Sequence, residues 1–440
     1  MSQNRLGRAV VIGGSIAGLL AARVLADVFS EVIIVEADVA PEGSTPRNKV
    51  PQSHHSHILL ERGQKTLEVM FPGIMDEMIQ NGSIVTDFTG DLKWFHFGQW
   101  KKRFHSGIRM VQQTRPFIEH HIRRRVEGIP NVALQYSTRA AGVVLSDDRN
   151  TVQGVQVRNE ATNGEETIMA DLVVEASGAG AQMLKWLNLD TDASEGVPIQ
   201  LFYATRFYRT DGVDRGWTNL MISAQLPELP YAGVVIPFEN QQIGVTLGGY
   251  LKGPPRTDEE FEQIAKSLPQ PDIYHFVQNA TPISDLKIYK ISSQSRKRKD
   301  IINKLPKRII MIGDSYCRFD PLYGQGMTVA AMEAELLHVM LSRNLTDKTM
   351  DSAIRDYWSM LPALTDDPWN MALVEAYRHP GITGARPFGI GLQKWFTKKI
   401  YQASAHDSSV YLRLAQVMNL TRPSSVFFKP SMLRKIIRKT

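Results

Sequence analysis

Short apolar runs and a longer stretch with helical spacing alternate at the start of the chain. The runs Ala9-Val-Val-Ile12 and Val32-Ile-Ile-Val35 flank an apolar stretch at 16–25. Fully apolar short runs are typical of strands buried on both faces, and a longer run between them is typical of a crossover helix. The pattern therefore predicts a strand, a helix and a second, parallel strand, the unit from which doubly wound α/β sheets are built.

The rest of the chain divides in the same way into predicted helices and strands. Helical spacing falls at 56–80, 115–126, 326–342 and, with loop breaks at 380–387, through most of 345–440. Strand-like patterns fall at 91–109, 170–178, 201–208, 218–224, 233–237, 243–250 and 308–313, and 132–157 predicts a hairpin or a three-stranded meander.

Composition narrows the class of protein and its compartment. The 440 residues are 43% hydrophobic and 22% charged, as in a globular chain long enough for two or three packed units. The single cysteine, Cys317, allows no intrachain disulfide and favours a reducing compartment, the cytoplasm. The first predicted strand begins too near the N-terminus for a cleavable signal, and no apolar run reaches the about 18 residues of a membrane span.

Basic residues gather at two places in a chain whose net charge is +6. The run at 296–299 predicts a solvated loop, and because aromatic residues are not interleaved with it, a nucleic-acid partner is not expected. The tail at 429–439 mixes cations with Met432, Leu433 and Ile436. This mixture predicts a terminal helix packed on the body of the protein, and peripheral contact with an anionic membrane surface is the alternative.

Glycines mark the predicted turn between the first strand and the first helix. Gly13 and Gly14 permit a sharp turn, and Gly18 permits close packing of helix on strand. The helix amides would then face a pyrophosphate, and Glu36 would accept hydrogen bonds from ribose hydroxyls, which favours FAD or NAD over NADP. Ser15 stands where the strict fingerprint has its second glycine. The alternative is a β-α-β unit whose glycines serve only packing.

A second glycine-rich segment, 313–328, decides between these cofactors. The predicted strand before it delivers Asp314, and Gly324 and Gly326 lead into the next helix. A carboxylate here can accept a hydrogen bond from a ribityl hydroxyl. The amides around Gly326 and Met327 can stabilise negative charge on the pyrimidine end of a reduced flavin. The two motifs together indicate FAD.

With both motifs, the chain resembles the FAD-dependent monooxygenases of the p-hydroxybenzoate hydroxylase type. Within this superfamily it is most similar to the branch with the polyether epoxidases of lasalocid and monensin biosynthesis. The resemblance covers about the first 390 residues. It is carried by the segment 47–60, with Val-Pro-Gln-Ser-His-His-Ser-His, by Phe319-Asp-Pro-Leu-Tyr-Gly-Gln-Gly-Met327, and by Asp367-Pro-Trp-Asn-Met-Ala372.

The resemblance implies an α/β fold, with a Rossmann-like FAD-binding domain, an inserted mixed β-sheet substrate domain and a helical C-terminal region. The FAD-binding domain is expected in three parts, 1–82, 111–190 and 291–345. A strand-rich insertion on the substrate side is expected at 83–110, the β-rich substrate domain at 191–290 and the helical region at 346–440.

Position by position, the resemblance implies which residues hold FAD. Residues 15–18 would contact the diphosphate and Arg47 would lie beside the cofactor loop. Arg115 would reach the ribityl-phosphate chain, where a permanently charged fork is favoured. The full implied set is Gly13, Gly14, Ser15, Ile16, Ala17, Gly18, Glu36, Ala37, Arg47, Gln52, Arg115, Asp314, Gly324, Gly326 and Met327.

The flavin is expected to carry the chemistry, so the resemblance assigns no catalytic residue with certainty. The candidates are His55, His57, Pro321 and Tyr323. His54, His55 and His57 lack a Cys or Glu at matching spacing, so no metal is expected. Aromatic residues of the strand-rich segments are candidates for an apolar substrate pocket, namely Trp94, Phe97, Tyr203, Trp217 and Phe238.

The implied reaction is oxygen insertion. NAD(P)H would reduce the flavin, O2 would add at C4a, and the hydroperoxide would give one oxygen atom to a hydrophobic substrate. Epoxidation of an alkene, such as a polyene, terpenoid or polyketide of secondary metabolism, is favoured. Aromatic hydroxylation, reduction of isoprenoid double bonds and flavin binding without turnover are the alternatives, and a halogenase is disfavoured because the sequence lacks Trp-x-Trp-x-Ile-Pro.

Two segments depart from the pattern of the hydroxylases, and the first of them bears on the source of electrons. The segment Glu175-Ala-Ser-Gly-Ala-Gly180 stands where many hydroxylases carry Ala-Asp-Gly, and His54 stands where they usually carry arginine. The first of these regions is tied to nicotinamide use in the hydroxylases. Two routes therefore stay open: direct reduction by NAD(P)H, or delivery of reduced flavin by a partner reductase.

Overall fold

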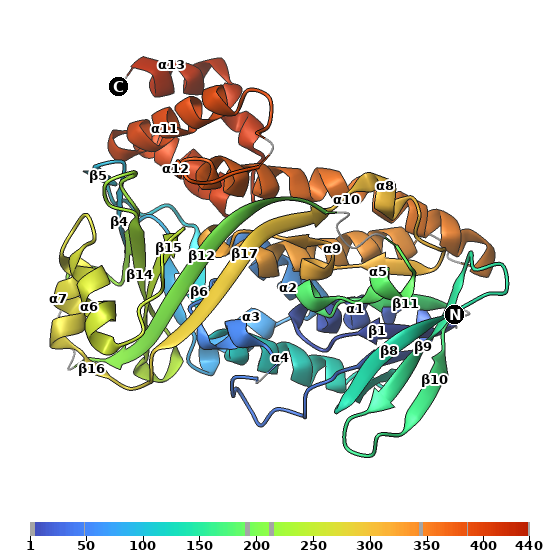
Figure 1. The fold of residues 1–440 in the computed structure, drawn as a ribbon. Coiled ribbons are helices and arrows are strands. Elements are labelled where there is room, and N and C mark those ends of the chain that lie inside the picture. The colour runs from blue at the N-terminus through green and yellow to red at the C-terminus, as the bar shows by residue number, and fades with distance from the viewer. Residues whose placement is uncertain are drawn as a thin grey trace.

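A five-stranded parallel sheet organises the half of the molecule that contains the N-terminus (Figure 1). The computed structural model describes residues 5–47, 49–189, 194–210, 215–342, 346–384 and 386–438. The strand order is β18-β11-β1-β2-β7, and the bounds are Leu6–Ile12 for β1, Phe29–Val35 for β2, Val132–Gln135 for β7, Leu172–Glu175 for β11 and Ile309–Met311 for β18. The predicted α/β fold is confirmed.

The register of this sheet brings the two glycine-rich motifs together. Ile12, the last residue of β1, lies beside Glu175 of β11, and Glu175 lies beside Met311 of β18. Because the strands are parallel, the loops that leave β1 and β18 emerge at the same edge. The helices that follow them, α1 (Ile16–Leu25) and α9 (Gly326–Leu341), pack against each other.

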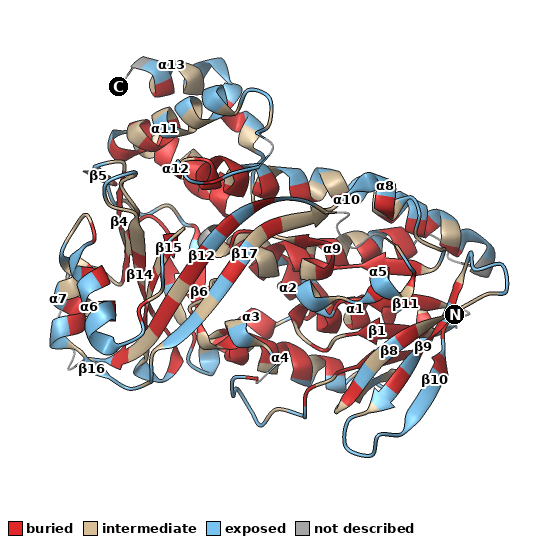
Figure 2. Ribbon diagram, in the orientation of Figure 1, coloured by how far each residue is buried: buried red, intermediate tan, exposed pale blue. Residues whose placement is uncertain are grey.

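The glycines of the first motif are required by close contacts. Gly13 has a φ of +104°, and a Cβ on it would lie 2.7 Å from the carbonyl oxygen of Ala176. A Cβ on Gly18 would lie 1.8 Å from the carbonyl oxygen of Gly13. Only glycine permits this approach of α1 to the end of β1. Figure 2 shows α1 and the sheet as a mostly buried layer.

The second sheet is mixed and combines segments that are far apart in the sequence. Its order is β19-β17-β12-β15-β14-β13-β4-β5, with β16 paired to β12. The long neighbours β12 and β17 cross Figure 1 diagonally. Helices α6 (Asp258–Lys266) and α7 (Asp272–Asn279) lie near the end of the mixed sheet that is farther from the parallel sheet. The strands of the mixed sheet are β4 (Leu92–His96), β5 (Gln99–Trp100), β12 (Ser194–Arg209), β13 (Asn219–Ile222), β14 (Tyr231–Pro237), β15 (Ile243–Tyr250), β16 (Thr281–Pro282), β17 (Lys287–Lys297) and β19 (Cys317–Arg318).

The segment predicted as a hairpin or meander from residue 132 divides between two sheets. Its first strand, β7, pairs in parallel with β2 and so completes the five-stranded sheet. The meander itself starts later and is formed by β8 (Thr138–Leu145), β9 (Val152–Asn159) and β10 (Glu165–Met169).

Two further predictions of local structure need correction. The helix predicted at 56–80 is two helices, α2 (Glu61–Met70) and α3 (Ile74–Gln80), because Gly73 between them takes a φ of +81°. The region predicted as strands at 91–109 contains β4 and β5. The next strand, β6 (Arg109–Gln112), pairs instead with β3 (Ile84–Asp87).

The basic run at 296–299 is not a loop, and only Arg298 and Lys299 in it are exposed. It ends β17 and begins α8 (Lys299–Ile302). Arg296 forms ion pairs with Glu195 and with Asp366, each at 2.6 Å, and its guanidinium lies 4.9 Å from the ring centre of Trp369. These partners come from other segments, which is why local charge density predicted the wrong environment.

The remaining elements are helical and lie mainly at the C-terminus, shown in red in Figure 1. Ile436 is fully buried, so the predicted packing of the terminal helix is confirmed. Among the described residues, no helix has the length and apolar character needed to cross a bilayer. The bounds are Arg115–Glu127 for α4, Met183–Trp186 for α5, Asp347–Ala376 for α10, Ile390–His406 for α11, Ser408–Met418 for α12 and Pro430–Arg438 for α13, with 3-10 turns at Pro51–His54 (η1), Gly178–Gly180 (η2), Glu239–Gln241 (η3), Gly313–Ser315 (η4), Pro321–Tyr323 (η5) and Ser424–Phe428 (η6).

Candidate active site

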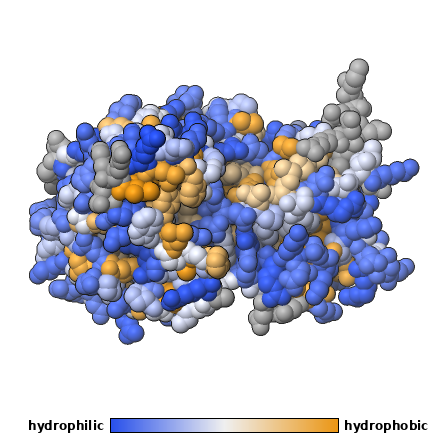
Figure 3. Space-filling view, turned by 90° about the horizontal axis from the view of Figure 1, so that it is seen from above, coloured by the Kyte–Doolittle hydropathy of each residue, from blue (hydrophilic) through white to orange (hydrophobic). Residues whose placement is uncertain are grey.

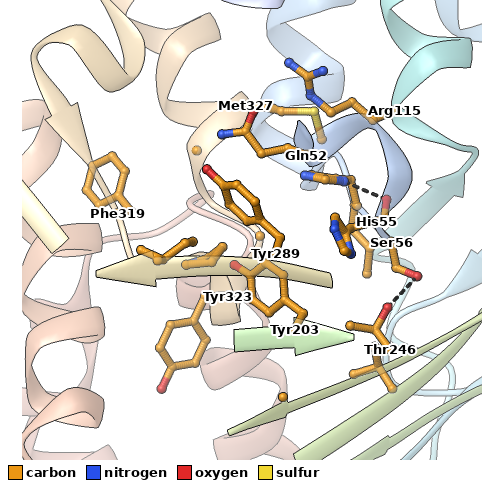
Figure 4. A pocket seen from close by; sticks show the side chains of 18 of the residues that line it. Gln52, His55, Ser56, Arg115, Tyr203, Thr246, Tyr289, Phe319, Tyr323 and Met327 are labelled. Carbon is orange, nitrogen blue, oxygen red and sulfur yellow. Dashed lines mark hydrogen bonds between the residues drawn. The ribbon is translucent and has the colours of Figure 1, made fainter. Parts of the chain in front are cut away.

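A cavity of about 590 Å³ runs from the edge of the parallel sheet to the mixed sheet (Figure 4). Both glycine-rich motifs contribute to its wall, although about 300 residues separate them in the chain. Ser15 to Ala17 line it at the start of α1, and Gly324, Gly326 and Met327 line it at the start of α9. Two helix N-termini therefore open into one cavity, which is a favourable place for an anionic ligand.

The structure brings most of the predicted FAD-binding residues together, but not all of them line the cavity. Gln52, Arg115 and Asp314 do so, beside the residues of the two motifs. The others are not among the lining residues, namely Gly13, Gly14, Gly18, Glu36, Ala37 and Arg47. Their direct contact with the cofactor stays a prediction.

Glu36 is engaged by the protein itself. Its Oε2 accepts a hydrogen bond from the Gly14 amide at 2.7 Å and an ion pair from Arg47 Nη2 at 2.6 Å. Its Oε1 accepts a hydrogen bond from the Asp38 amide at 2.7 Å. A carboxylate oxygen can accept two hydrogen bonds, so Oε1 retains the capacity for one ribose hydroxyl.

Glu119 of α4, which no motif in the sequence marks, is the centre of a buried charge cluster. It lies 2.7 Å from Arg47, 3.3 Å from Arg115 and 2.5 Å from Arg123. It also accepts a hydrogen bond from Ser15 at 2.8 Å. Burial alone would raise the pKa of Glu119, but the three guanidinium groups outweigh it and lower this pKa to about 2.

This cluster fixes the side chains around the first motif. Arg115 Nη2 donates a hydrogen bond to Ser15 Oγ at 2.7 Å, which ties α4 to the start of α1. Burial opposes the charge of Arg47, yet Glu119 and Glu36 raise its pKa above the ordinary value. Burial lowers the pKa of Arg115, and Glu119 and Asp314 counteract this effect. Because a guanidinium stays protonated in proteins, both arginines are charged beside the cavity, where they would favour a diphosphate.

The second motif presents a carboxylate and a helix start to the cavity. Asp314 follows β18, and the left-handed backbone of Gly313 and Gly324, each with a φ of +65°, turns the loop around it. Burial raises the pKa of Asp314, and Arg318 and Arg115 counteract this effect. Arg318 also lines the cavity, and no motif in the sequence marked it as a site residue.

His55 and His57 lie on the cavity wall but point to different partners. His55 Nδ1 is 2.8 Å from Thr205 Oγ1, and His57 Nδ1 is 2.8 Å from the carbonyl oxygen of His55. Burial lowers the pKa of His55 to about 3 and that of His57 to about 4, so both rings are neutral at physiological pH. In the part of the chain that is described, no group of three or more His, Cys, Asp or Glu side chains is placed to hold a metal ion.

A chain of hydroxyl groups and two tyrosines surrounds His55. Thr205 is 2.8 Å from Thr246, and Thr246 donates a hydrogen bond to Ser56 at 3.0 Å. The rings of Tyr203 and Tyr289, on the paired strands β12 and β17, stand 6.2 Å apart and project into the cavity (Figure 4). The polar partners of His55 thus come from the mixed sheet.

The end of the cavity away from the motifs is largely apolar. It is bounded by β4, β6, β13, β14 and α12, through Leu92, Trp94, Met110, Leu220, Val234, Ile236 and Met418. His96 also lines this end, and its buried Nδ1 has no hydrogen-bond partner. A hydrophobic ligand with one polar group would fit these surroundings.

Of the predicted pocket aromatics, Trp94 and Tyr203 line the cavity and the other three lie elsewhere. Phe97 packs beside Tyr401 and under Arg378. Trp217 lies against Phe276 of α7, and Phe238 lies against Phe207. All three lie just before or after a strand of the mixed sheet, where the alternation of side chains across a strand no longer fixes their direction.

Pro321 and Tyr323, the other catalytic candidates, lie on the cavity wall in η5. The hydroxyl of Tyr323 accepts a hydrogen bond from that of Tyr401 at 3.4 Å, which links the second motif to α11. Burial raises the pKa of Tyr323 well above its ordinary value, so its hydroxyl stays protonated. The structure therefore assigns Tyr323 a bridging contact, and no direct role in catalysis follows from it.

Fold and site together define a flavoprotein oxidoreductase: a parallel sheet with two helix N-termini at one cavity, and a second sheet that encloses the other end. The sequence of residues 8–360 matches the family model described as FAD binding domain, so the chain belongs to this family and FAD is its cofactor. Protein Rv3254 of Mycobacterium tuberculosis (strain ATCC 25618 / H37Rv) is 28% identical over 362 residues, which are 78% of this chain and 74% of that protein.

Solved structures share the fold at low sequence identity. PqsL of P. aeruginosa in complex with 2-aminobenzoylacetate is 16% identical, with a TM-score of 0.67 over 85% of this chain and 96% of that chain. The p-nitrophenol 4-monooxygenase PnpA from Pseudomonas putida DLL-E4 is 16% identical, with a TM-score of 0.66 over 95% and 99%. The flavin-dependent brominase Bmp2 is 12% identical, with a TM-score of 0.68 over 98% of each chain.

Proposed function

We propose that the protein is a FAD-dependent monooxygenase that transfers one atom of O2 to a hydrophobic substrate, with NAD(P)H as the source of electrons. The observation that carries this proposal is the continuity of the cavity from the two motifs to the apolar end near Trp94. A cofactor held by the motifs would share one cavity with a ligand held by the mixed sheet. When bound, FAD supplies the redox chemistry, and the chain supplies position and exclusion of water.

The residues present fit FAD. The start of α1, with Arg115 beside it, offers amides and a fixed positive charge to a diphosphate. Asp314 offers a carboxylate to the hydroxyl chain, and the amides at Gly326 and Met327 offer partial positive charge to the pyrimidine end of the ring system. Gln52 and the neutral His55, which also line the cavity, offer further hydrogen-bonding groups.

Within this class, we place alkene epoxidation ahead of aromatic hydroxylation. The resemblance of the segment 47–60 to the polyether-epoxidase branch supports epoxidation, and the apolar end of the cavity suits a polyene, terpenoid or polyketide. Aromatic hydroxylation is the second candidate, because PnpA, a p-nitrophenol 4-monooxygenase, has the same fold. An unpartnered His96 Nδ1 would serve a polar group of either substrate.

The test is a coupled measurement of NAD(P)H oxidation, O2 uptake and product mass with purified holoenzyme. A lipophilic alkene and a phenol are supplied in turn, under ¹⁸O2. A monooxygenase consumes one O2 and one NAD(P)H per product and places one ¹⁸O atom in it. An alkene reduced without O2 uptake would indicate a double-bond reductase, and FAD binding without any turnover would indicate a passive flavin-binding protein.

The electron source is tested in the same preparation. Anaerobic addition of NADPH or NADH should bleach the flavin absorbance if the chain accepts hydride directly. If bleaching requires an added flavin reductase, the partner route is correct. Bromide or chloride should leave the product unchanged, whereas a halogenated product would overturn the monooxygenase proposal in favour of halogenation.

A further inference from the structure

Large apolar side chains are exposed on the outer face of the C-terminal helices. Phe388 is 103% exposed, Leu392 69%, Trp395 46% and Phe428 62%. Residues 388, 392 and 395 are separated by four and three positions, so they follow one side of α11 and the turn before it. Phe396 stacks on Phe428 at 5.3 Å and joins this side to η6. These five residues are called the C-terminal apolar patch below.

Most of the half of α11 that carries the patch is exposed, and Phe396 is the member of the patch that packs against the buried cluster of the C-terminal helices. The buried residues of α11 begin only at Ile400. Figure 3 looks onto this region and shows orange apolar side chains gathered among blue polar ones. Single exposed apolar residues are ordinary on protein surfaces, whereas a contiguous aromatic group marks an interaction surface.

Charge indicates what this surface contacts. Residues 386–440 contain eleven Lys and Arg residues and one acidic residue, Asp407, so they carry a formal charge of +10, while the whole chain carries +6. The rest of the chain is therefore net negative. Lys394 and Lys398 are interleaved with the patch along α11. The segment that carries the exposed aromatic residues is thus strongly positive.

We propose that the C-terminal apolar patch docks on a lipid bilayer surface that contains anionic phospholipids. The aromatic and leucine side chains enter the boundary between headgroups and acyl chains, and the surrounding cations contact phosphate and carboxylate headgroups. A second copy docked through the same face would bring a second +10 segment against the first, which opposes a symmetric dimer. Charge therefore favours the bilayer.

The docking rests on exposure and charge alone and does not depend on the proposed reaction. It adds a route for the substrate, because a hydrophobic molecule dissolves in the bilayer that the protein contacts. Helix α12, which packs against α11, contributes Met418 to the cavity wall. The membrane face and the cavity thus belong to neighbouring helices.

The first experiment is flotation of the full-length holoprotein with phosphatidylcholine vesicles, with and without phosphatidylserine. We expect partitioning at least about tenfold stronger on the anionic vesicles, and its loss at high salt. Failure of the parent protein to float with anionic vesicles overturns the inference. The fold and FAD content of each preparation are checked by circular dichroism and flavin absorbance, which separates this result from failure of the proposed function.

Two double variants test the two components of the surface. Leu392→Ser with Trp395→Ser removes apolar contact, and Lys394→Glu with Lys398→Glu reverses charge; each should weaken partitioning on anionic vesicles at least about tenfold. The matched controls are Val69→Ser, which is 73% exposed on α2, and the exposed Lys304→Glu, and both should float like the parent. Parental partitioning of both double variants would refute the assignment of the patch.

A third variant reports the position of the helix directly. Brominated phosphatidylserine should quench tryptophan fluorescence of the parent, and Trp395→Phe should keep the partitioning but lose most of the quenching. A parent that is dimeric in solution and becomes monomeric in the Leu392→Ser, Trp395→Ser variant would overturn the proposal in favour of self-association.

Discussion

Substitution of Glu119 by glutamine tests the charge cluster beside the first motif. Glutamine keeps the shape of the side chain and can still accept the hydrogen bond from Ser15. It removes the negative charge that Arg47, Arg115 and Arg123 share. The variant therefore leaves a buried excess of positive charge at the point where α1 and α4 meet.

The size of the effect follows from the pKa of Glu119. Burial raises this pKa, but the three arginines lower it from 4.5 to about 2 in the folded protein. A difference of this size corresponds to about 3 kcal/mol of unfolding free energy at neutral pH. Removal of one partner from a buried ion pair costs about 3–5 kcal/mol in other proteins, so the two estimates agree.

The sign of the pH dependence is also fixed. Because the folded pKa is depressed, the unfolded state binds the extra proton, and the stabilisation is present above the unfolded pKa and lost as pH falls towards about 2. The difference in stability between parent and Glu119→Gln should therefore shrink on acidification.

Urea unfolding followed by circular dichroism, at neutral and at acidic pH, measures both quantities. The control is Glu127→Gln on the same helix, where the carboxylate is exposed, and its unfolding free energy should stay within about 0.5 kcal/mol of the parent. Equal stability of parent and Glu119→Gln at neutral pH, or a difference that does not change with pH, would refute the reasoning.

Three further predictions follow from the geometry. Gly18→Ala places a Cβ 1.8 Å from the Gly13 carbonyl oxygen, so it should lower the unfolding free energy by at least about 1–3 kcal/mol and weaken FAD binding in a flavin titration, whereas Gly253→Ala, with open space around it, should do neither. Burial lowers the pKa of Lys101 to about 7, so the free energy of unfolding should rise by up to about 1.4 kcal/mol per pH unit above pH 7, and a flat profile, or the same rise in Lys101→Met, would contradict this. Burial lowers the pKa of His57 to about 4, so nitrogen-detected NMR should show its ring neutral at pH 6, and a midpoint near 6.5 would show that the ring is solvated.

Elements with strong local signals were predicted correctly from the sequence. The apolar runs at β1, β2, β11 and β18 are buried on both faces, which makes them recognisable without knowledge of their neighbours. The glycines of both motifs predict turns without knowledge of distant segments, because a positive φ, as at Gly13 and Gly324, favours glycine. The parallel arrangement then places both motifs at one edge.

The sequence could not reveal partners that depend on distant segments. Tyr289 lies on β17, whose polar sequence has little alternation and was not assigned as a strand, although β17 pairs along most of β12. Glu119 sits in a helix whose polar residues would ordinarily face solvent, and only the approach of Arg47 reveals its role. In both cases the environment of the residue depends on a partner that is far away in the sequence.

The sequence also did not reveal which of the aromatic residues near the mixed sheet line the cavity. Trp94 and Phe97 lie three positions apart in one strand-rich segment, yet only Trp94 lines the cavity. Phe97 follows β4 with a left-handed backbone, at a φ of +50°, and its ring packs towards Tyr401. The aromatic composition predicted a pocket beside this sheet, whereas the direction of the backbone determines which aromatic side chains line it.

The central claim is that two distant glycine-rich segments hold one FAD, and its most direct test is FAD affinity measured by calorimetric titration of the apoprotein. Asp314→Ala should bind FAD about tenfold or more weakly, through loss of a hydrogen bond to a charged group worth about 1.5–3 kcal/mol, while the exposed Asp300→Ala should bind like the parent. A folded parent that does not take up FAD, or an Asp314→Ala variant with parental affinity, would contradict the account.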